Sequence, residues 1–377
     1  MKKINVALIG LAFGGFFSEI YKNHPNVNRL ILFDVDKKRE KNLRDRLSIT
    51  EEYDTLEDIL KDSSIDAIHF VTPLHMHEDQ CVAALEAGKH CACTVPMGIS
   101  VDGVKRIVGA VRKTGKNYMM METTLYTYPY FYARQMKEKG EFGKIQFLRG
   151  CHYQDMVNWP DYWAGLPPMY YGTHAIGPIT VLAGSRIKRV RCLGSGTMNP
   201  EYQKYYGNPY PVETALLEYE NGLIGEVTRS LFETAREYKE GFNVYGSKRS
   251  FEWGFKDADA PIVTTAIPPK EGNRGGTCIE ETVGLPLYSE NLPESIQKYA
   301  VRGGDFDPLN PQKSWRAELG VGHHGSHPHL VHEFISSILE ERKPAVDEII
   351  GANITLAGIC AHESAIKNGE PVEIPEL

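Results

Sequence analysis

Residues 4–15 read INVALIGLAFGG, and residues 30–34 read LILFD. The apolar runs predict two buried parallel strands, the glycines predict a tight turn, and a helix beginning near Ala12 is expected between the strands. Such a turn lets the backbone approach a pyrophosphate, and the amino-terminal end of the helix stabilises its negative charge. Asp34 follows Gly15 by 19 residues, where a carboxylate would accept hydrogen bonds from a ribose diol. The two stretches therefore predict a dinucleotide-binding unit.

The turn departs from the pattern G-x-G-x-x-G because Ala12 replaces its middle glycine, and a methyl group there is expected to crowd the phosphate. The alternative is a doubly wound domain in which Gly10 and Gly15 only make a tight turn. NAD is expected in preference to NADP, because the Asp34 carboxylate would repel a 2′-phosphate. The residues of this region predicted to contact the cofactor are Gly10, Ala12, Phe13, Gly14, Gly15 and Asp34.

Length and composition indicate an ordinary globular protein with two domains, since 377 residues are 42% hydrophobic and 24% charged. A formal net charge of −7 without a basic cluster argues against a nucleic-acid partner. The start, MKKI, does not resemble a signal peptide, and no run of about 18 apolar residues predicts a membrane span. Seven cysteines without a paired spacing favour free thiols, and a cytoplasmic location is expected.

The pattern of elements predicts an α/β chain with two domains. Strands and helices alternate up to residue 121 and indicate the six strands of a doubly wound parallel sheet, so residues 1–122 are expected to form an NAD(P)-binding Rossmann domain. Residues 123–377 are expected to form an α+β domain for substrate and oligomerisation. After a helix at about 130–139, hairpins at 214–231 and 243–253 predict an open, largely antiparallel sheet with helices on one face. A homodimer or homotetramer would cover its other face.

Three further segments complete this organisation. Residues 256–312, rich in proline and glycine, are expected to be a long excursion from the sheet. Helices are expected at about 330–341 and 352–367.

Polar and turn residues follow several strands of the first domain. Ligands of doubly wound sheets bind outside the carboxyl ends of the strands, so these residues are expected near the cofactor. They are Thr72, Pro73, His77, Thr94, Pro96 and Glu122.

The segment T-P-x-x-x-H at 72–77, the run AGKH at 87–90 before Pro96, and the open second sheet together resemble the glucose–fructose oxidoreductase, inositol dehydrogenase and MocA family. The resemblance implies an NAD(P)-dependent dehydrogenase or reductase of sugars and polyols, with Thr72, Pro73 and His77 contacting the cofactor. The family usually has Glu-Lys-Pro at positions 94–96, with the lysine beside the nicotinamide. Val95 replaces it here and carries no proton, so any acid–base role of that lysine must be filled elsewhere or be absent.

Residues 168–178, PMYYGTHAIGP, resemble the family's G-x-H-x-x-D region, whose histidine contacts the substrate hydroxyl. His174 matches that histidine, whereas Gly177 stands where the aspartate is usual. His174 is therefore the expected catalytic residue, with Tyr171 and Glu122 sharing the role. The alternatives are a packing histidine that caps a helix and a tyrosine that only packs.

Tyr171, Val95 and Glu122 are also similar to the NAD-dependent α-N-acetylgalactosaminidase branch of the family, which hydrolyses glycosides by transient oxidation of C3 and elimination from C2 and C1. The residues at 154–155 and 165–167 depart from that branch. An oxidoreductase acting on a sugar or polyol is the favoured interpretation. The alternatives are an oxidation–elimination glycosidase and a cofactor-binding regulator that lost the chemistry.

The stretch GHHGSHPHLVH at 322–332 suggests a zinc site. With Ser326 as the N-cap of a helix, His329 and His332 would lie one turn apart. Three convergent ligands are not evident, so no metal is expected. Binding of sugar hydroxyls by these histidines is the favoured interpretation, and the alternative without a function is a helix start exposed to solvent. Arg229, Arg236 and Tyr238 are expected either to reach the substrate or to make surface salt bridges.

Overall fold

The computed structural model describes residues 2–203, 205–272, 274–302 and 323–377, which form two compact units. The first unit contains Met1–Tyr126, Leu287–Thr355 and Leu377, and the second contains Thr127–Pro286 and Leu356–Glu376. This division differs from the expected boundary at 122/123, because the described residues 287–302 and 323–355 group with the first unit. They do so because helix α10 (Ser326–Leu339) packs against α1 (Gly15–Asn23).

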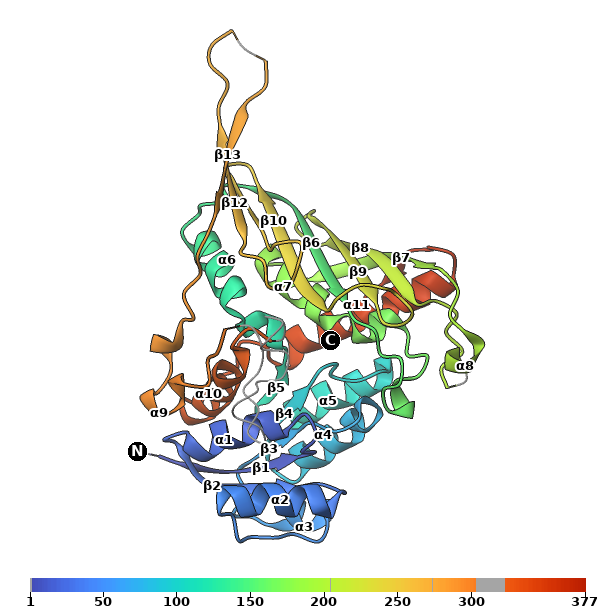
Figure 1. Ribbon diagram of the computed structural model, residues 1–377. Coiled ribbons are helices and arrows are strands. Elements are labelled where there is room, and N and C mark those ends of the chain that lie inside the picture. The colour runs from blue at the N-terminus through green and yellow to red at the C-terminus, as the bar shows by residue number, and fades with distance from the viewer. Residues whose placement is uncertain (1, 204, 273, 303–322) are drawn as a thin grey trace. The chain divides into compact units, whose positions relative to one another are not determined.

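The first unit is built on a parallel sheet of five strands in the order β2-β1-β3-β4-β5 (Figure 1). The strands are β1 (Ile4–Ile9), β2 (Val27–Phe33), β3 (Ala67–Phe70), β4 (His90–Thr94) and β5 (Tyr118–Met121). The parallel sheet is confirmed, but the expected count of six strands is wrong. Residues 34–66 contribute two helices, α2 (Lys37–Leu47) and α3 (Leu56–Lys61), and no strand.

Helices connect the strands in the doubly wound pattern. Helix α1 begins at Gly15 instead of near Ala12, because residues 12–14 remain in the turn that follows β1. Helix α10 begins at Ser326, and its N-cap is Gly325 in a left-handed conformation, so the expected Ser326 cap is wrong. The other helices of this unit are η1 (Leu74–Met76), α4 (His77–Glu86), α5 (Val101–Thr114), η2 (Thr123–Tyr126), η5 (Ser289–Asn291) and α9 (Glu294–Gln297).

The second unit is built on a nine-stranded sheet in the order β13-β12-β11-β10-β6-β9-β8-β7-β14. Among the described strands of this sheet, only β6 and β9 pair in parallel, and the predicted hairpins β8/β9 and β10/β11 are confirmed. The strands are β6 (Ile145–Tyr153), β7 (Ile187–Ser195), β8 (Val212–Tyr219), β9 (Ile224–Ser230), β10 (Lys239–Gly246), β11 (Arg249–Glu252), β12 (Ile262–Ile267), β13 (Thr277–Thr282) and β14 (Val372–Glu373).

Helix α7 (Thr173–Ala183) packs on one face of this sheet, against β6, β9 and β10. Gly150 makes the close approach possible, since a Cβ at this position would lie 2.1 Å from the Ala175 carbonyl oxygen. The other described helices of the unit are α6 (Tyr128–Glu138), η3 (Asp161–Trp163), η4 (Pro168–Tyr171), α8 (Pro200–Gln203) and α11 (Glu348–Ile366) from Leu356 onward. A glycine on β6 thus sets how near α7 comes to the strands.

The expected excursion over 256–312 contains a regular hairpin, β12/β13, which extends from the edge of the sheet in Figure 1. Residues 303–312 of that segment, and Gly322 of the histidine-rich stretch, lie outside the described residues. Helix α11 (Glu348–Ile366) has the length and mean hydropathy, 1.3, of a membrane span. Because 67% of that window is buried inside the protein, α11 is more typical of a core helix.

Candidate active site

The turn after β1 in the first unit has the shape that a dinucleotide requires. Gly10 has a φ of 85°, and a Cβ there would lie 2.4 Å from the Val71 carbonyl oxygen. A Cβ on Gly14 would lie 2.0 Å from the Gly10 carbonyl oxygen, whereas one on Gly15 would make only an ordinary contact of 3.9 Å with Leu43. Gly10 and Gly14 are therefore the glycines that the backbone approach depends on. Ala12 is exposed, so its methyl group does not crowd the turn itself.

Asp34 follows β2 and is buried beside this turn. Its carboxylate accepts hydrogen bonds from the Leu11 amide at 2.7 Å and the Asp36 amide at 2.8 Å. Arg39 also bonds both carboxylate oxygens, at 3.1 and 3.3 Å. The acid is thus held at the carboxyl end of β2, where the sequence predicts a ribose ligand, and a guanidinium lies directly next to it. The turn and this acid fit an NAD molecule.

His77 lies between two of the predicted cofactor loops and is buried. Its Nδ1 is 2.8 Å from the Pro96 carbonyl oxygen, and its Nε2 is 2.9 Å from the Thr72 carbonyl oxygen. The ring therefore holds the ends of β3 and β4 at a fixed separation. Its direct contact with the cofactor, and those of Thr72, Pro73, Thr94 and Pro96, stay predictions.

Glu122 is buried at the carboxyl end of β5. One of its carboxylate oxygens accepts hydrogen bonds from the Thr124 amide at 3.1 Å and the Thr124 hydroxyl at 2.6 Å. The structure therefore places Glu122 in the first unit, at the strand end where the sequence predicts it.

The histidine-rich stretch packs against aromatic rings close to the turn. The ring of His327 lies 4.4 Å from that of Phe17 and 5.6 Å from that of Phe13, and His323 lies 5.4 Å from Phe13. His332 contacts His24 through ring nitrogens 3.1 Å apart. Among the described residues, the one group of side chains arranged as possible metal ligands lies elsewhere, in the second unit.

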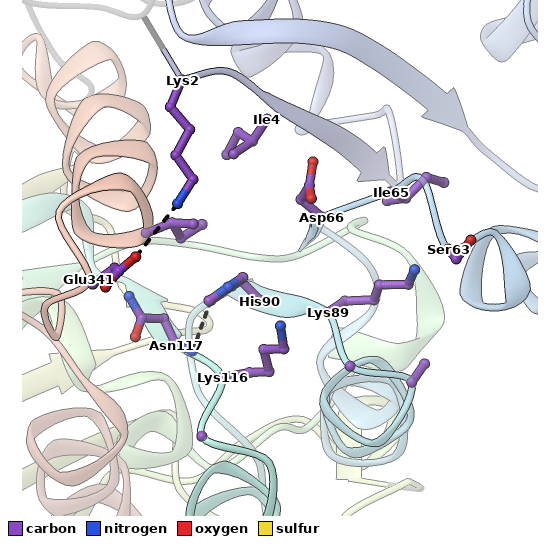
Figure 2. Close-up of a pocket in the computed structure, with 14 residues that line it drawn as sticks. Lys2, Ile4, Ser63, Ile65, Asp66, Lys89, His90, Lys116, Asn117 and Glu341 are labelled. Atoms are coloured by element: carbon purple, nitrogen blue, oxygen red, sulfur yellow. Dashed lines mark hydrogen bonds and ion pairs between the residues drawn. The ribbon is translucent and has the colours of Figure 1, made fainter.

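A cavity of about 470 Å³ opens at the opposite edge of the parallel sheet, where the strands begin (Figure 2). Lys2 and Glu341 form an ion pair at 3.6 Å beside it, and the Asn117 amide donates to His90 Nδ1 at 3.0 Å. Burial lowers the pKa of His90 to about 4. This cavity lies away from the strand ends that carry Gly10, Thr94 and Glu122, so it is not the cofactor site.

Four ionisable side chains form a row across neighbouring strands of the second unit. Glu240 of β10 pairs with His152 of β6, His152 pairs with Arg229 of β9, and Arg229 pairs with Glu213 of β8. Paired residues point to the same face of a sheet, and all four are buried. Burying ionisable groups is costly, so such a row is typical of a functional site.

His174, the second residue of α7, completes an acid–base cluster with this row. Its Nε2 is 3.9 Å from Glu240 Oε1, and its ring centre is 5.0 Å from that of His152. The Tyr238 hydroxyl donates to Glu240 Oε1, and burial followed by the Glu240 charge raises the pKa of Tyr238 well above its usual value. Tyr171 lies 5.4 Å from His174 between ring centres. The structure therefore places Tyr171 beside His174, and the catalytic roles of both stay predictions.

The same cluster has the donors of a metal site. The ligand atoms of His152, His174 and Glu240 all lie within 4.8 Å of one another. Two imidazoles and a carboxylate are a ligand set that zinc accepts. The cluster can therefore act either as an acid–base group or as a metal ligand set, and these two roles exclude each other at His174.

Arg229 is 0% exposed, so the expectation of substrate contact or a surface salt bridge is wrong for this residue. Its guanidinium donates to carbonyl oxygens of Tyr171 at 2.9 Å, His152 at 3.3 Å and Ser230, and to Gln154 Oε1 at 3.1 Å. Burial lowers its pKa to about 10. Arg236 instead donates to the Phe255 carbonyl at 2.6 Å near the surface.

Sequence reasoning missed His152, Glu240 and Glu213. The signal that could have found them is their phase in the strands. His152 is in phase with the buried Leu148, and Glu240 is in phase with the buried Phe242. A polar residue at an inward position of an amphipathic strand is costly and so marks a candidate site.

These features define the class of protein: an oxidoreductase with an NAD-binding Rossmann domain and a second α+β domain that carries a buried acid–base cluster. The chain belongs to the GFO/IDH/MocA family. Residues 4–122 match the oxidoreductase family model with the NAD-binding Rossmann fold, and residues 130–252 match the GFO/IDH/MocA C-terminal domain.

Sequence relatives of the chain carry the name glycosyl hydrolase family 109. Glycosyl hydrolase family 109 protein 1 of Bacteroides thetaiotaomicron is 24% identical over 339 residues, which cover 83% of this chain and 69% of the relative. Its namesake in Phocaeicola vulgatus is 26% identical over 72% of this chain and 60% of its own length.

Solved structures of sugar and polyol dehydrogenases have the same fold. Levoglucosan dehydrogenase in complex with NADH and levoglucosan has a TM-score of 0.79 at 22% identity, with 100% of both chains covered. The myo-inositol 2-dehydrogenase of Lactobacillus plantarum has a TM-score of 0.75 at 17% identity, over 99% of this chain and 100% of its own.

Proposed function

We propose that this chain oxidises a secondary hydroxyl of a sugar or polyol and that His174 takes the hydroxyl proton. Bound NAD supplies the hydride acceptor for such a reaction. The observation that carries the proposal is the buried cluster of His174, His152 and Glu240. A positioned imidazole beside a carboxylate is suited to accept a proton and to return it in the reverse direction.

The cluster also stabilises the charged form of His174. The Glu240 carboxylate, 3.9 Å away, stabilises the imidazolium that forms when His174 accepts the proton. Tyr238 stays protonated and donates to Glu240, so it fixes the position of that carboxylate. Val95 leaves no lysine at the usual family position, and His174 takes over its acid–base role in this proposal.

The test is the rate of NADH formation with a panel of neutral sugars and polyols. His174→Ala should lower turnover by about 10²–10⁴, the usual contribution of a positioned acid–base group. Phe255→Ala, at an exposed ring of the second unit, is the control and should leave the rate within about twofold. A His174→Ala rate equal to that of the wild type would remove His174 from the mechanism.

A second candidate function is glycoside hydrolysis through transient oxidation. Two observations favour it: the glycosyl hydrolase family 109 relatives, and the presence of Tyr171 beside His174 as a second group that can exchange a proton. Turnover would then continue with far less NAD than substrate, because the hydride returns in each cycle. A regulator without chemistry would turn over no sugar at all.

We also propose a homodimer or homotetramer located in the cytoplasm. Leu193 and Leu216 are exposed on the sheet of the second unit, and a second copy would cover them. Seven free cysteines support a reducing compartment. Light scattering of the purified protein tests the first point, and a monomer at all concentrations would contradict it.

A further inference from the structure

Four aromatic side chains of the second unit lead from its surface toward the acid–base cluster; we call Trp159, Tyr162, Trp163 and Tyr171 the aromatic strip. Trp163 is its centre, with ring distances of 5.9 Å to Trp159, 5.6 Å to Tyr162 and 4.9 Å to Tyr171. Trp163 is 9% exposed and Trp159 is 37% exposed, while Tyr162 and Tyr171 are half-buried. The strip therefore offers apolar surface to a ligand as well as packing against itself.

The segment that carries the strip is held in place by specific contacts. Met156 is buried, its amide donates to the Leu231 carbonyl at 2.9 Å, and its carbonyl accepts from the Trp159 amide at 3.1 Å. The Tyr206 hydroxyl donates to the Tyr162 carbonyl at 2.9 Å. Asn158 has a φ of 66°, a left-handed conformation that asparagine adopts more readily than most residues with a Cβ. These contacts thus hold a turn that presents the Trp159 indole at the surface.

The strip ends at the proposed catalytic group, since the rings of Tyr171 and His174 lie 5.4 Å apart. A sugar whose reacting hydroxyl is at His174 would extend its remaining atoms over Tyr171 and Trp163. The apolar C–H faces of a pyranose and an aromatic aglycone both pack well on such rings. The rest of the aromatic strip would then contact the substituent attached to the reacting sugar.

The charges near the strip select among glycosides. Asp155 and Asp161 are exposed in the same segment and would repel a phosphate or carboxylate. Arg229, the cation beside Tyr171, is fully buried and directs its hydrogen bonds to oxygens of the protein. Neither these two acids nor the buried Arg229 offers a counter-ion to an anionic substituent, whereas a neutral substituent needs none.

We propose that the aromatic strip binds the substituent of a neutral glycoside, so that the enzyme prefers a glycoside to the free sugar. This inference rests on the proposed sugar oxidation at His174. It assigns Trp159 as a specificity-determining residue that touches the aglycone or a second sugar.

The experiment compares the free sugar that the wild type oxidises best with its phenyl α- and β-glycosides and its 6-phosphate. One phenyl glycoside should have a kcat/KM about tenfold above that of the free sugar, the expected contribution of one aromatic contact. Trp159→Ala should remove that advantage mainly through KM and leave the free sugar within about twofold. Trp159→Phe, which keeps a ring, should restore part of it. Phe255→Ala, at a ring that is 80% exposed elsewhere in the unit, is the matched control and should change nothing.

A Trp159→Ala variant that keeps the full preference, or that slows both substrates equally, would overturn the inference, and so would a preference for the 6-phosphate. If the wild type oxidises none of these compounds, the proposed function fails. Calorimetric titration of both phenyl glycosides then tests, separately from catalysis, whether the strip binds the substituent. Binding by the wild type that is lost in Trp159→Ala supports the strip. No binding by the wild type, or binding unchanged in Trp159→Ala, overturns it.

Discussion

The pair of Asp34 and Arg39 sets the cofactor preference at the level of single residues. Asp34 is placed to accept from a ribose diol, but Arg39 already bonds both its oxygens and is a ready partner for a phosphate. The native protein should bind NAD more tightly than NADP, and Asp34→Ala should narrow the difference because it removes the repulsion and frees Arg39. Asp45→Ala, at an exposed acid of α2 that pairs with Lys41, should leave the preference unchanged. Calorimetric titration of both cofactors is the measurement, and tighter binding of NADP by the native protein would contradict the assignment.

The three donors of the acid–base cluster make a second prediction at this scale. If His174 moves the substrate proton, zinc that occupies His152, His174 and Glu240 should inhibit the enzyme, and a chelator should restore the rate. His152→Ala should weaken zinc inhibition because it removes one ligand. Loss of activity on treatment with a chelator, restored by added zinc, would instead identify the cluster as a required metal site.

At the scale of elements, two charged residues of the buried row hold the short helix η4 in place. Glu213 Oε2 accepts from the Met169 amide at 2.8 Å, and Arg229 donates to the Tyr171 carbonyl at 2.9 Å. His362 Nδ1 lies 2.6 Å from the other Glu213 oxygen and helps to hold that carboxylate. The backbone that carries Tyr171 is therefore fixed at both ends by the sheet beneath it.

Removing either charge should destabilise the protein and misplace Tyr171. Arg229→Met leaves buried carbonyl oxygens without their donor and should lower the free energy of unfolding by about 3–5 kcal/mol. Arg229→Lys keeps the charge and should cost less. Urea denaturation measures both variants, and an Arg229→Met protein as stable as the wild type would contradict this role.

The elements also show where prediction from sequence succeeds. The strand, turn and acid of residues 4–34 are close in the chain, so the Rossmann unit and its glycine turn followed from local pattern. The acid–base cluster depends on β6 and β10, whose pairing of His152 with Glu240 joins residues far apart in sequence. No short motif records that pairing, and only His174 and Tyr171, which share one segment, could be predicted. The strand count was wrong because the strands of residues 1–122 form a sheet of five, β1 to β5.

Buried histidines make the stability of the molecule depend on pH. Burial lowers the pKa of both His24 and His69 from 6.5 to about 3, with His332 adding to the effect at His24 and His327 at His69. The unfolded chain binds protons at these residues below about pH 6.5, whereas the folded chain binds them only below about pH 3. The contribution of these histidines to the free energy of unfolding should therefore be fully present above pH 6.5. It should fall as the pH decreases toward 3, by up to about 1.4 kcal/mol per pH unit for each histidine.

Urea denaturation at several pH values between 7 and 4 tests this expectation. His24→Gln should reduce the slope of stability against pH, and His75→Gln, at an exposed position, should leave it unchanged. A wild-type stability that is constant over this range would show that the two histidines are protonated in the folded protein as easily as in the unfolded chain.

The molecule as a whole combines an NAD-binding unit with a unit that carries the acid–base cluster, and net oxidation of a sugar is the central claim. The most direct measurement is the reaction of a phenyl glycoside with NAD in D₂O, with NADH counted against product and the product examined for deuterium at C2 at early times. Net oxidation predicts one NADH per ketosugar glycoside, with no deuterium at C2, because simple oxidation never breaks that C–H bond. Free sugar that carries deuterium at C2, released without accumulation of NADH, would contradict net oxidation and establish the glycosidase.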